Sequence, residues 1–270
     1  MTEAMAVGQL QVVRRDEWGK PVPIIRGTGE CREIVGTRTG CALRSLYHVD
    51  LGQLSSTVTL KHPGEAVYYV LEGSAEFSSA AGGMTVPAGG MVHVAPGNTY
   101  TISSVVGARV LGGPAPVDID FGADLGEDVE SVRAGDGLRS FHKDEPGLMV
   151  PFISHDARLV VWYGAAARSA NMNYVVLEPG ERNKEHVHAY SEDTIFIVEG
   201  HGTAEDVTHG RKVPVGPGDT ATIPAGVWHA VAADRGERMV SVGGPCPADL
   251  DMLRAVGVDV EAIDRRNGGR

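Results

Sequence analysis

The sequence predicts an all-β protein that contains two copies of one sandwich-type or barrel-type domain. Short segments rich in β-branched and aromatic residues are interrupted by Gly or Pro about every 8 to 12 residues, which is typical of such folds. No long stretch has helical periodicity. The chain also repeats itself once. Because a solenoid needs at least three stacked units, each copy must close its own core.

The composition excludes several classes of protein and of partner. Of the 270 residues, 42% are hydrophobic and 22% charged, with 36 Gly and 15 Pro, which is typical of a turn-rich globular protein. The net charge of −11, without any stretch rich in Lys and Arg, argues against a nucleic-acid partner. No apolar run approaches the roughly 18 residues of a membrane helix and no secretory leader is evident, so we expect no membrane partner and a cytoplasmic location.

Three blocks of sequence recur in the same order. The two copies of the first block are 127 residues apart when they are aligned on Gly73 and Gly200. The copies of the second and third blocks are 129 and 131 residues apart, so the two copies differ only by short insertions. The paired blocks are 66–77 with 194–205, 86–102 with 215–231, and 111–120 with 242–251. One domain has therefore been duplicated within the chain.

The blocks divide the chain into five expected parts. These are an N-terminal arm, a first domain, an acidic connector, a second domain, and a C-terminal helix with a tail. Their expected boundaries are 1–27, 28–120, 121–155, 156–250 and 251–270. The arm alternates apolar and polar residues, so it should add a strand to a sheet edge, either of the other domain or of a neighbouring chain in a homo-oligomer.

Residues that can bind a metal are grouped in the second copy. His186 and His188 are two positions apart on an expected strand, so both imidazoles should face the same side. Asp193 opens the next apolar strand, and His229 follows a Pro-Ala-Gly turn that could bring it across a barrel. Three neutral nitrogens and one carboxylate oxygen suit Fe(II), Mn(II), Zn(II) or Ni(II). We therefore expect one divalent transition metal per chain.

The order and spacing of these residues resemble the two signature motifs of the cupin superfamily. Gly180, the paired histidines, an acid and Gly200 follow the first motif; Gly218, the Pro-Ala-Gly turn and the last histidine follow the second. The resemblance implies a jelly-roll barrel, or double-stranded β-helix, that is present twice as a bicupin. The acid of the family is usually Glu. Counting back from Gly200 selects Asp193, and the adjacent Glu192 is the alternative if the turn is shorter.

The first copy has lost most of this group of ligands. With a loop of equal length, Thr59 and Lys61 stand at the two histidine positions; with a loop one residue shorter, Leu60 and His62 stand there. In both alignments Ala66 stands at the acid position and Tyr100 at the last histidine position. A divalent ion is therefore not expected there. We expect a degenerate barrel that serves as a scaffold, and the alternative is a metal-free pocket that uses Lys61, His62, His93 or Tyr100.

Three further residues of the second copy are candidates for substrate binding. The strand parity that points His186 inward also points Arg182 and Lys184 inward, provided that the strand extends back to Gly180. Both residues could instead be solvated surface charges. Asn173 and Tyr174 lie on the preceding strand, and only one of the two can face the pocket; Asn173 is the candidate.

The site favours a metalloenzyme that acts on a small, carboxylate-bearing metabolite. The resemblance to cupins implies only a small metabolite that can bind a metal through adjacent oxygens, and among the possible reactions we expect that of an Fe(II)-type dioxygenase first. The alternative is a non-oxidative isomerase, decarboxylase or ureidoglycine-aminohydrolase-like enzyme, although the Glu-x-His-x3-His pattern of the aminohydrolases is absent. A third hypothesis is a cupin that binds a metabolite without turnover. The sequence shows no helix-turn-helix segment that could couple such binding to DNA, which makes this hypothesis weaker.

Overall fold

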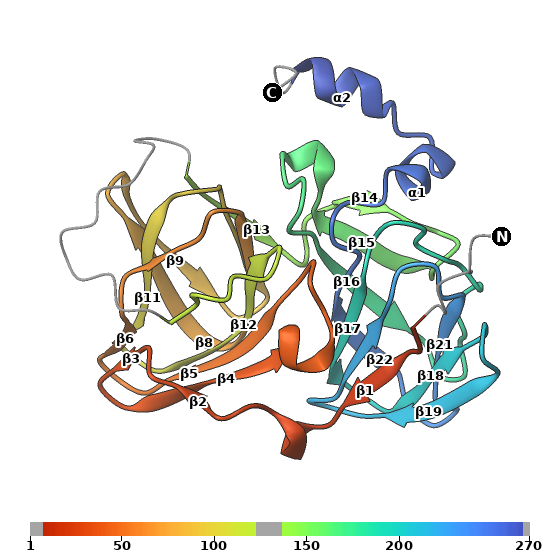
Figure 1. Cartoon of the computed structure of the whole chain (residues 1–270), viewed down its shortest axis with the longest axis horizontal. Helices are drawn as coiled ribbons and strands as arrows, with labels where there is room; N and C mark the ends of the chain where they lie inside the picture. Colours follow the sequence, from red (N-terminus) through yellow and green to blue (C-terminus); the bar gives the residue numbers. More distant parts are fainter. Residues whose placement is uncertain (1–7, 123–136, 267–270) are drawn as a thin grey trace, which may run out of the picture.

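Two β-barrels lie side by side in the computed structural model, which describes residues 8–122 and 137–266 (Figure 1). The strands pair antiparallel, and only short helices accompany them. The all-β class predicted from the Gly- and Pro-punctuated segments is therefore confirmed, and so are the two tandem jelly-roll barrels that the resemblance to cupins implied. No helix in these two ranges is long and apolar enough to span a membrane.

The first barrel is formed by one sheet of 12 strands. The central strand of this sheet is the long β8, which pairs with β9, β10, β11 and β12. The strands are β2 (Pro21–Val22), β3 (Ile25–Arg26), β4 (Gly29–Val35), β5 (Leu46–Leu51), β6 (Ser55–Thr57), β7 (Leu60–Lys61), β8 (Glu65–Ser79), β9 (Gly82–Pro87), β10 (Gly90–Val94), β11 (Thr99–Ser104), β12 (Ala108–Ala115) and β13 (Leu138–His142).

The second barrel is formed by a sheet of seven strands in the order β1-β20-β17-β22-β16-β15-β14 and a sheet of three strands in the order β19-β18-β21. The strands are β1 (Gln11–Val13), β14 (Leu148–Met149), β15 (Asp156–Val161), β16 (Met172–Leu177), β17 (Asp193–Glu199), β18 (Gly202–Asp206), β19 (Arg211–Val215), β20 (Thr220–Ile223), β21 (His229–Ala233) and β22 (Met239–Gly243). Short 3-10 turns lie at Arg15–Glu17, Thr37–Thr39 and Tyr163–Ala165.

An apolar core is shared between the barrels. It combines residues of the first barrel, such as Leu46 and Met91, with residues of the second, such as Met172 and Val242, and all four are almost completely buried. Arg44 of the first barrel also enters this boundary, where its guanidinium donates to the carbonyl oxygen of Asn171 at 2.7 Å. Each barrel has a further core of its own. The two barrels therefore associate through much more than the chain that connects them.

Gly73 and Gly200, on which the repeat was aligned, occupy the same tight bend in the two barrels. Their φ angles are 72° and 73°, a conformation that side chains rarely adopt. A Cβ atom would lie 2.2 Å from the carbonyl oxygen of Gly107 at the first position and 2.0 Å from that of Arg238 at the second. The repeated glycine is thus required by the close approach of the neighbouring strand.

The N-terminal arm crosses from one barrel to the other. Its strand β1 pairs with β20 of the second barrel, with Gln11 opposite Thr222, and its strands β2 and β3 then pair with β4 and β6 of the first. The edge strand predicted from the alternating pattern is present, and the sheet edge belongs to the other barrel of the same chain. Nothing in this arrangement bears on a homo-oligomer.

The segment expected to connect the barrels contains strands of both. Part of it, residues 123–136, lies outside the described residues. Within the remainder, β13 pairs with β10 of the first barrel and β14 pairs with β15 of the second. At the C-terminus, Asp249 caps the predicted helix α1 (Leu250–Ala255), and a second helix, α2 (Val260–Arg266), follows where only a tail was expected.

Candidate metal centre

Four side chains predicted as ligands meet inside the second barrel. Asp193 is the first residue of β17 and His229 the first of β21, while His186 forms an isolated bridge with His229 and His188 follows two positions later. One nitrogen or oxygen atom of each residue lies within 4.8 Å of the others. Residues from three separate parts of the chain thus present their polar atoms to one point.

The backbone and one carboxylate fix the tautomer of each histidine. The Nδ1 atom of His186 donates to the carbonyl oxygen of Lys184 at 2.9 Å, and that of His229 donates to the carbonyl oxygen of Val227 at 3.0 Å. The Nδ1 atom of His188 donates to Oδ2 of Asp249 at 2.6 Å. Since each Nδ1 donates, the Nε2 atom of each imidazole in its neutral form is an acceptor directed at the centre.

The atoms that converge at the centre are therefore acceptors without a donor. Nε2 of His229 and Oδ1 of Asp193 are buried and have no hydrogen-bond partner. The distances from Oδ2 of Asp193 to Nε2 of His188 and of His229, 3.7 and 3.5 Å, are too long for hydrogen bonds. Buried polar atoms are normally paired, so this donor set fits a divalent cation.

Burial and mutual proximity keep the centre in the ionisation state that a cation needs. Burial, followed by the neighbouring imidazoles of His229 and His188, lowers the pKa of His186 to about 3. Burial acts to raise the pKa of Asp193, but its interactions with the three histidines outweigh this, so the pKa is lowered. The histidine is thus neutral and the aspartate ionised near pH 7.

The two adjacent acids point to different parts of the molecule. Asp193 is buried beside the histidines, whereas the carboxylate of Glu192 accepts hydrogen bonds from the backbone nitrogens of Ala42 and Leu43 in the first barrel, at 3.0 and 2.8 Å. Of the two alternatives left by the sequence, the geometry places Asp193 at the centre. The carboxylate of Glu192 is hydrogen-bonded at the boundary between the barrels.

The expected inward direction of Arg182 and Lys184 needs correction. Arg182 pairs with Glu205 and Glu185, each at 2.8 Å, and Lys184 is exposed. Residues 180–188 do not form a continuous strand; they are joined to the barrel by isolated bridges at Arg182 and His186. Strand parity therefore does not extend back from the histidines to these two cations.

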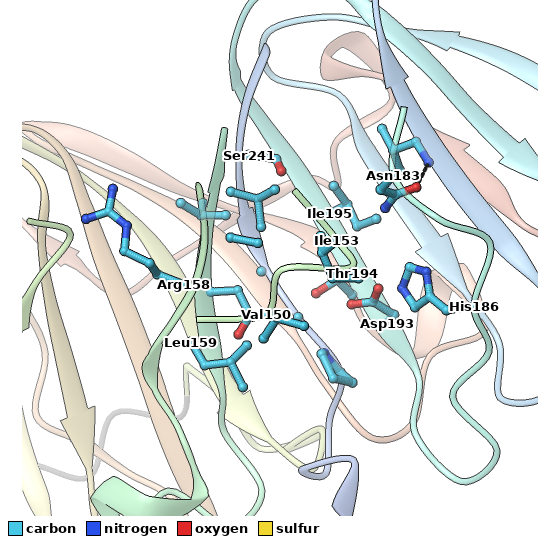
Figure 2. A pocket seen from close by; sticks show the side chains of 18 of the residues that line it. Val150, Ile153, Arg158, Leu159, Asn183, His186, Asp193, Thr194, Ile195 and Ser241 are labelled. Carbon is cyan, nitrogen blue, oxygen red and sulfur yellow. Dashed lines mark hydrogen bonds between the residues drawn. The ribbon is translucent and has the colours of Figure 1, made fainter. Parts of the chain in front are cut away.

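A pocket of about 620 Å³, including its open mouth, adjoins the centre and is lined by His186, His188 and Asp193. Asn173 also lines this pocket, whereas Tyr174 faces the shared core, so the expected choice between the two falls on Asn173. Oδ1 of Asn173 and Oγ1 of Thr194 are both buried without a hydrogen-bond partner. Figure 2 shows Thr194, Asp193 and His186 on the same side of the pocket.

The first barrel contains a hydrogen-bonded chain at the corresponding place. The backbone nitrogen of Gly97 binds the carbonyl oxygen of His62, as that of Gly226 binds His188, so the shorter-loop alignment describes the structure. Nδ1 of His62 lies 2.9 Å from Asp118, and its Nε2 accepts from Tyr100 at 2.6 Å. The one retained imidazole therefore has no free acceptor for a metal.

Asp249 is the carboxylate that orients His188, and it is not among the residues predicted from the sequence. A signal was present, because Asp118 and Asp249 occupy the same place in the third repeated block, and each binds Nδ1 of the matching histidine. Burial acts to raise the pKa of Asp249, but the hydrogen bond with His188 and the backbone nitrogen of Met252 lower it, so the carboxylate is ionised. Hydrogen bonds of this kind set the orientation of ligand histidines.

Comparison with known proteins gives the family of the second barrel, because residues 173–242 match the family model described as a cupin domain. The second barrel is a cupin domain, and the whole chain has the bicupin fold. Among curated proteins, none matches this sequence. The family match covers the strands that carry Asn173, Asp193 and His229.

Solved structures similar to this bicupin cover nearly its whole length. The oxalate decarboxylase of Lactobacillus farciminis, in a formate complex, superposes with a TM-score of 0.67 and 14% identity over 97% of each chain. The oxalate decarboxylase of Bacillus subtilis at pH 4.6 gives 0.65 and 14% over 92% of this chain and 78% of that one. Vicilin from hazelnut, Corylus avellana, gives 0.64 and 14% over 88% and 85%. At such identities the similarity shows the fold alone, and none of these structures supports the dioxygenase hypothesis.

Proposed function

We propose that this bicupin is a metalloenzyme that decarboxylates a small carboxylic acid without consuming dioxygen. Its one divalent transition metal, Fe, Mn, Zn or Ni, would be held by His186, His188, Asp193 and His229. The observation that carries the proposal is the convergence of three unprotonated Nε2 atoms and one carboxylate with no donor among them. The similarity in fold to two oxalate decarboxylases supports decarboxylation over the oxygenase chemistry expected from the sequence.

The pocket supplies the remaining parts of such a site. When bound, the metal supplies a Lewis acid for the carboxylate. The unpartnered Oδ1 of Asn173 can accept from a substrate hydroxyl, and the hydroxyl of Thr194 can donate to a substrate oxygen. Asn173 thus keeps the substrate-binding role proposed for it, whereas Arg182 and Lys184 lie outside the pocket.

The proton balance of decarboxylation points to water. When the bond to the carboxylate breaks, its electron pair stays on the remaining carbon, which must then take up a proton. Among the described residues that line the pocket, the titratable side chains are His186, His188, Asp193 and Arg158. The first three form the metal centre and the last is always protonated. We therefore assign the final proton to water that enters through the mouth of the pocket.

The proposal is tested by metal analysis followed by gas measurements. The purified protein should contain one equivalent of a divalent transition metal and should release CO₂ from a member of a panel of oxalate and 2-oxo acids, with no oxygen uptake at an electrode. Oxygen uptake stoichiometric with substrate loss would instead establish a dioxygenase. Tight binding of a carboxylate without any product would indicate a binding protein.

A further inference from the structure

The wall of the pocket beyond the metal centre is apolar. Val150, Ile153, Leu159, Val175 and Met252 line it, and they come from the segment before β15, from β15 itself, from β16 and from helix α1. Figure 2 shows Val150, Ile153, Leu159 and Ile195 gathered beside Asp193 and Thr194. The pocket therefore combines polar groups, which include three of the four candidate ligands and Asn173, Asn183, Thr194 and Ser241, with an extended apolar part of its wall.

Among the residues that the structure describes, Arg158 is the one cationic side chain that lines the pocket, and its guanidinium is directed away from it. The guanidinium of Arg158 is bound by Asp156 at 2.7 Å and donates to the carbonyl oxygen of Lys143. It also lies over the ring of Tyr174, 5.2 Å from its centre. In Figure 2 this side chain points away from the apolar group. Among the described residues that line the pocket, no positively charged side chain is therefore available to bind a second carboxylate.

A second carboxylate does not match the apolar part of the wall. If the oxygens of the substrate are held at the centre, a further carboxylate directed into this wall would lose its hydration without an ionic partner, which is costly. An alkyl or aryl group in the same place would be stabilised by removal of its surface from water. The wall therefore selects for an apolar substituent.

We propose that the substrate is a monocarboxylate with a second oxygen beside the carboxylate and a branched alkyl or aryl group that occupies the apolar wall. This inference rests on the proposed function, because it takes the four-residue centre as the point that holds the oxygens. It adds the class of substrate, and it identifies Val175 and Ile153 as residues that determine specificity. Both are only partly buried, so they can be changed without opening the core.

The test compares two acids that have the same oxygen-bearing end. Binding of 2-oxopropanoate and of 4-methyl-2-oxopentanoate to the Mn(II)-loaded protein is measured by calorimetry. Each buried carbon contributes about fourfold to affinity, so the branched acid should bind at least about tenfold more tightly than the short one. Equal affinities, or no binding of either acid, would overturn the inference.

Two variants and a control locate the effect in the wall. Val175→Thr, which keeps the shape but replaces a methyl group by a hydroxyl, should reduce the preference for the branched acid at least about threefold. The matched control Val213→Thr lies in β19, outside the pocket, and should leave the preference unchanged. Ile153→Arg should weaken the branched acid and strengthen binding of oxalate. A preference that neither pocket variant alters would overturn the inference.

The measurement separates this inference from the proposed reaction. If the preference for the branched acid is present and is lost in Val175→Thr, while no CO₂ is released from any acid, the substrate class stands and decarboxylation is wrong. If CO₂ is released from oxalate but the branched acid has no advantage in binding, decarboxylation stands and the substrate class is wrong.

Discussion

The carboxylates of Glu65 and Glu192 make the same contact in opposite directions between the two barrels. Glu65 of the first barrel accepts from the backbone nitrogens of residues 168–170 at 2.7 to 3.0 Å, and Glu192 of the second accepts from those of residues 42–43. The two glutamates are 127 residues apart, the spacing of the first repeated block. Duplication has thus produced a pair of equivalent, reciprocal contacts between the barrels.

Glu192→Ala should weaken the boundary between the barrels without loss of metal. Two backbone donors would lose an ionised acceptor, which lowers the free energy of unfolding by about 1–3 kcal/mol. Urea unfolding followed by circular dichroism measures this change. Glu199→Ala is a suitable control, because Glu199 is exposed and pairs with Arg238 at the surface. A protein that unfolds like the unaltered one but has lost its metal would reverse the roles of Glu192 and Asp193.

Asp193→Ala should lower metal affinity by at least about 100-fold, because it removes the one anionic ligand of the centre. The measurement is competition with a chelator of known affinity, followed by metal analysis. Tyr100→Phe in the first barrel removes the hydroxyl that binds His62 and should leave one equivalent per chain. Two equivalents in the unaltered protein would show that the first barrel also binds an ion.

Asp249→Ala should lower metal affinity by about 10- to 100-fold although Asp249 is not a proposed ligand. Its carboxylate holds the Nδ1 proton of His188, and loss of such a partner frees the imidazole to rotate and makes it less basic. The matched control is Asp251→Ala in the same helical turn, where an exposed carboxylate pairs with Arg254. Equal effects in the two variants would mean that the helix, and not the orientation of His188, is responsible.

The metal-free protein should become less stable as the pH falls from about 6.5. The folded state holds the pKa of His186 at about 3, and burial also lowers the pKa of His62 and of His48. Below the ordinary value of 6.5, the unfolded chain therefore binds protons that the folded chain excludes, which favours unfolding. We expect His186 to account for a loss of roughly 2 kcal/mol at pH 5, and His62 and His48 to add to it.

Urea unfolding at a series of pH values measures this loss. The variant His186→Asn should have a shallower pH dependence, since it removes one of the groups concerned. Added metal should flatten the profile of the unaltered protein, because a bound cation competes with protons for the same nitrogens. A free energy of unfolding that stays constant from pH 7 to pH 4.5 would contradict the burial of these imidazoles in their neutral form.

The convergence of the four candidate ligands could be predicted from the sequence because they lie at regular spacing between glycines. Strand ends placed by Gly200 and by the turn at Gly226 bring Asp193 and His229 together regardless of the loops between them. The directions of Arg182 and Lys184 failed for the opposite reason, since side-chain alternation was applied to residues that do not form a continuous strand.

Contacts between the barrels could not be predicted in the same way. The choice between Asp193 and Glu192 depends on backbone donors at residues 42–43, about 150 positions earlier in the chain. Asp249 likewise binds His188 although it lies 61 residues later in the sequence, and only its match with Asp118 in the repeat indicated a role. Such pairings depend on how the folded layers pack, which periodicity along one strand does not encode.

The strand β1 has a consequence for the order in which the chain can fold during synthesis. It leaves the ribosome about 200 residues before its partner β20, as the bond from Arg14 to the carbonyl oxygen of Pro214 illustrates. Until then residues 11–13 have no sheet to join, and β20 would in turn present an open edge if the second barrel were produced alone. The first barrel can form while translation continues, but the second is finished only when β1 pairs with β20.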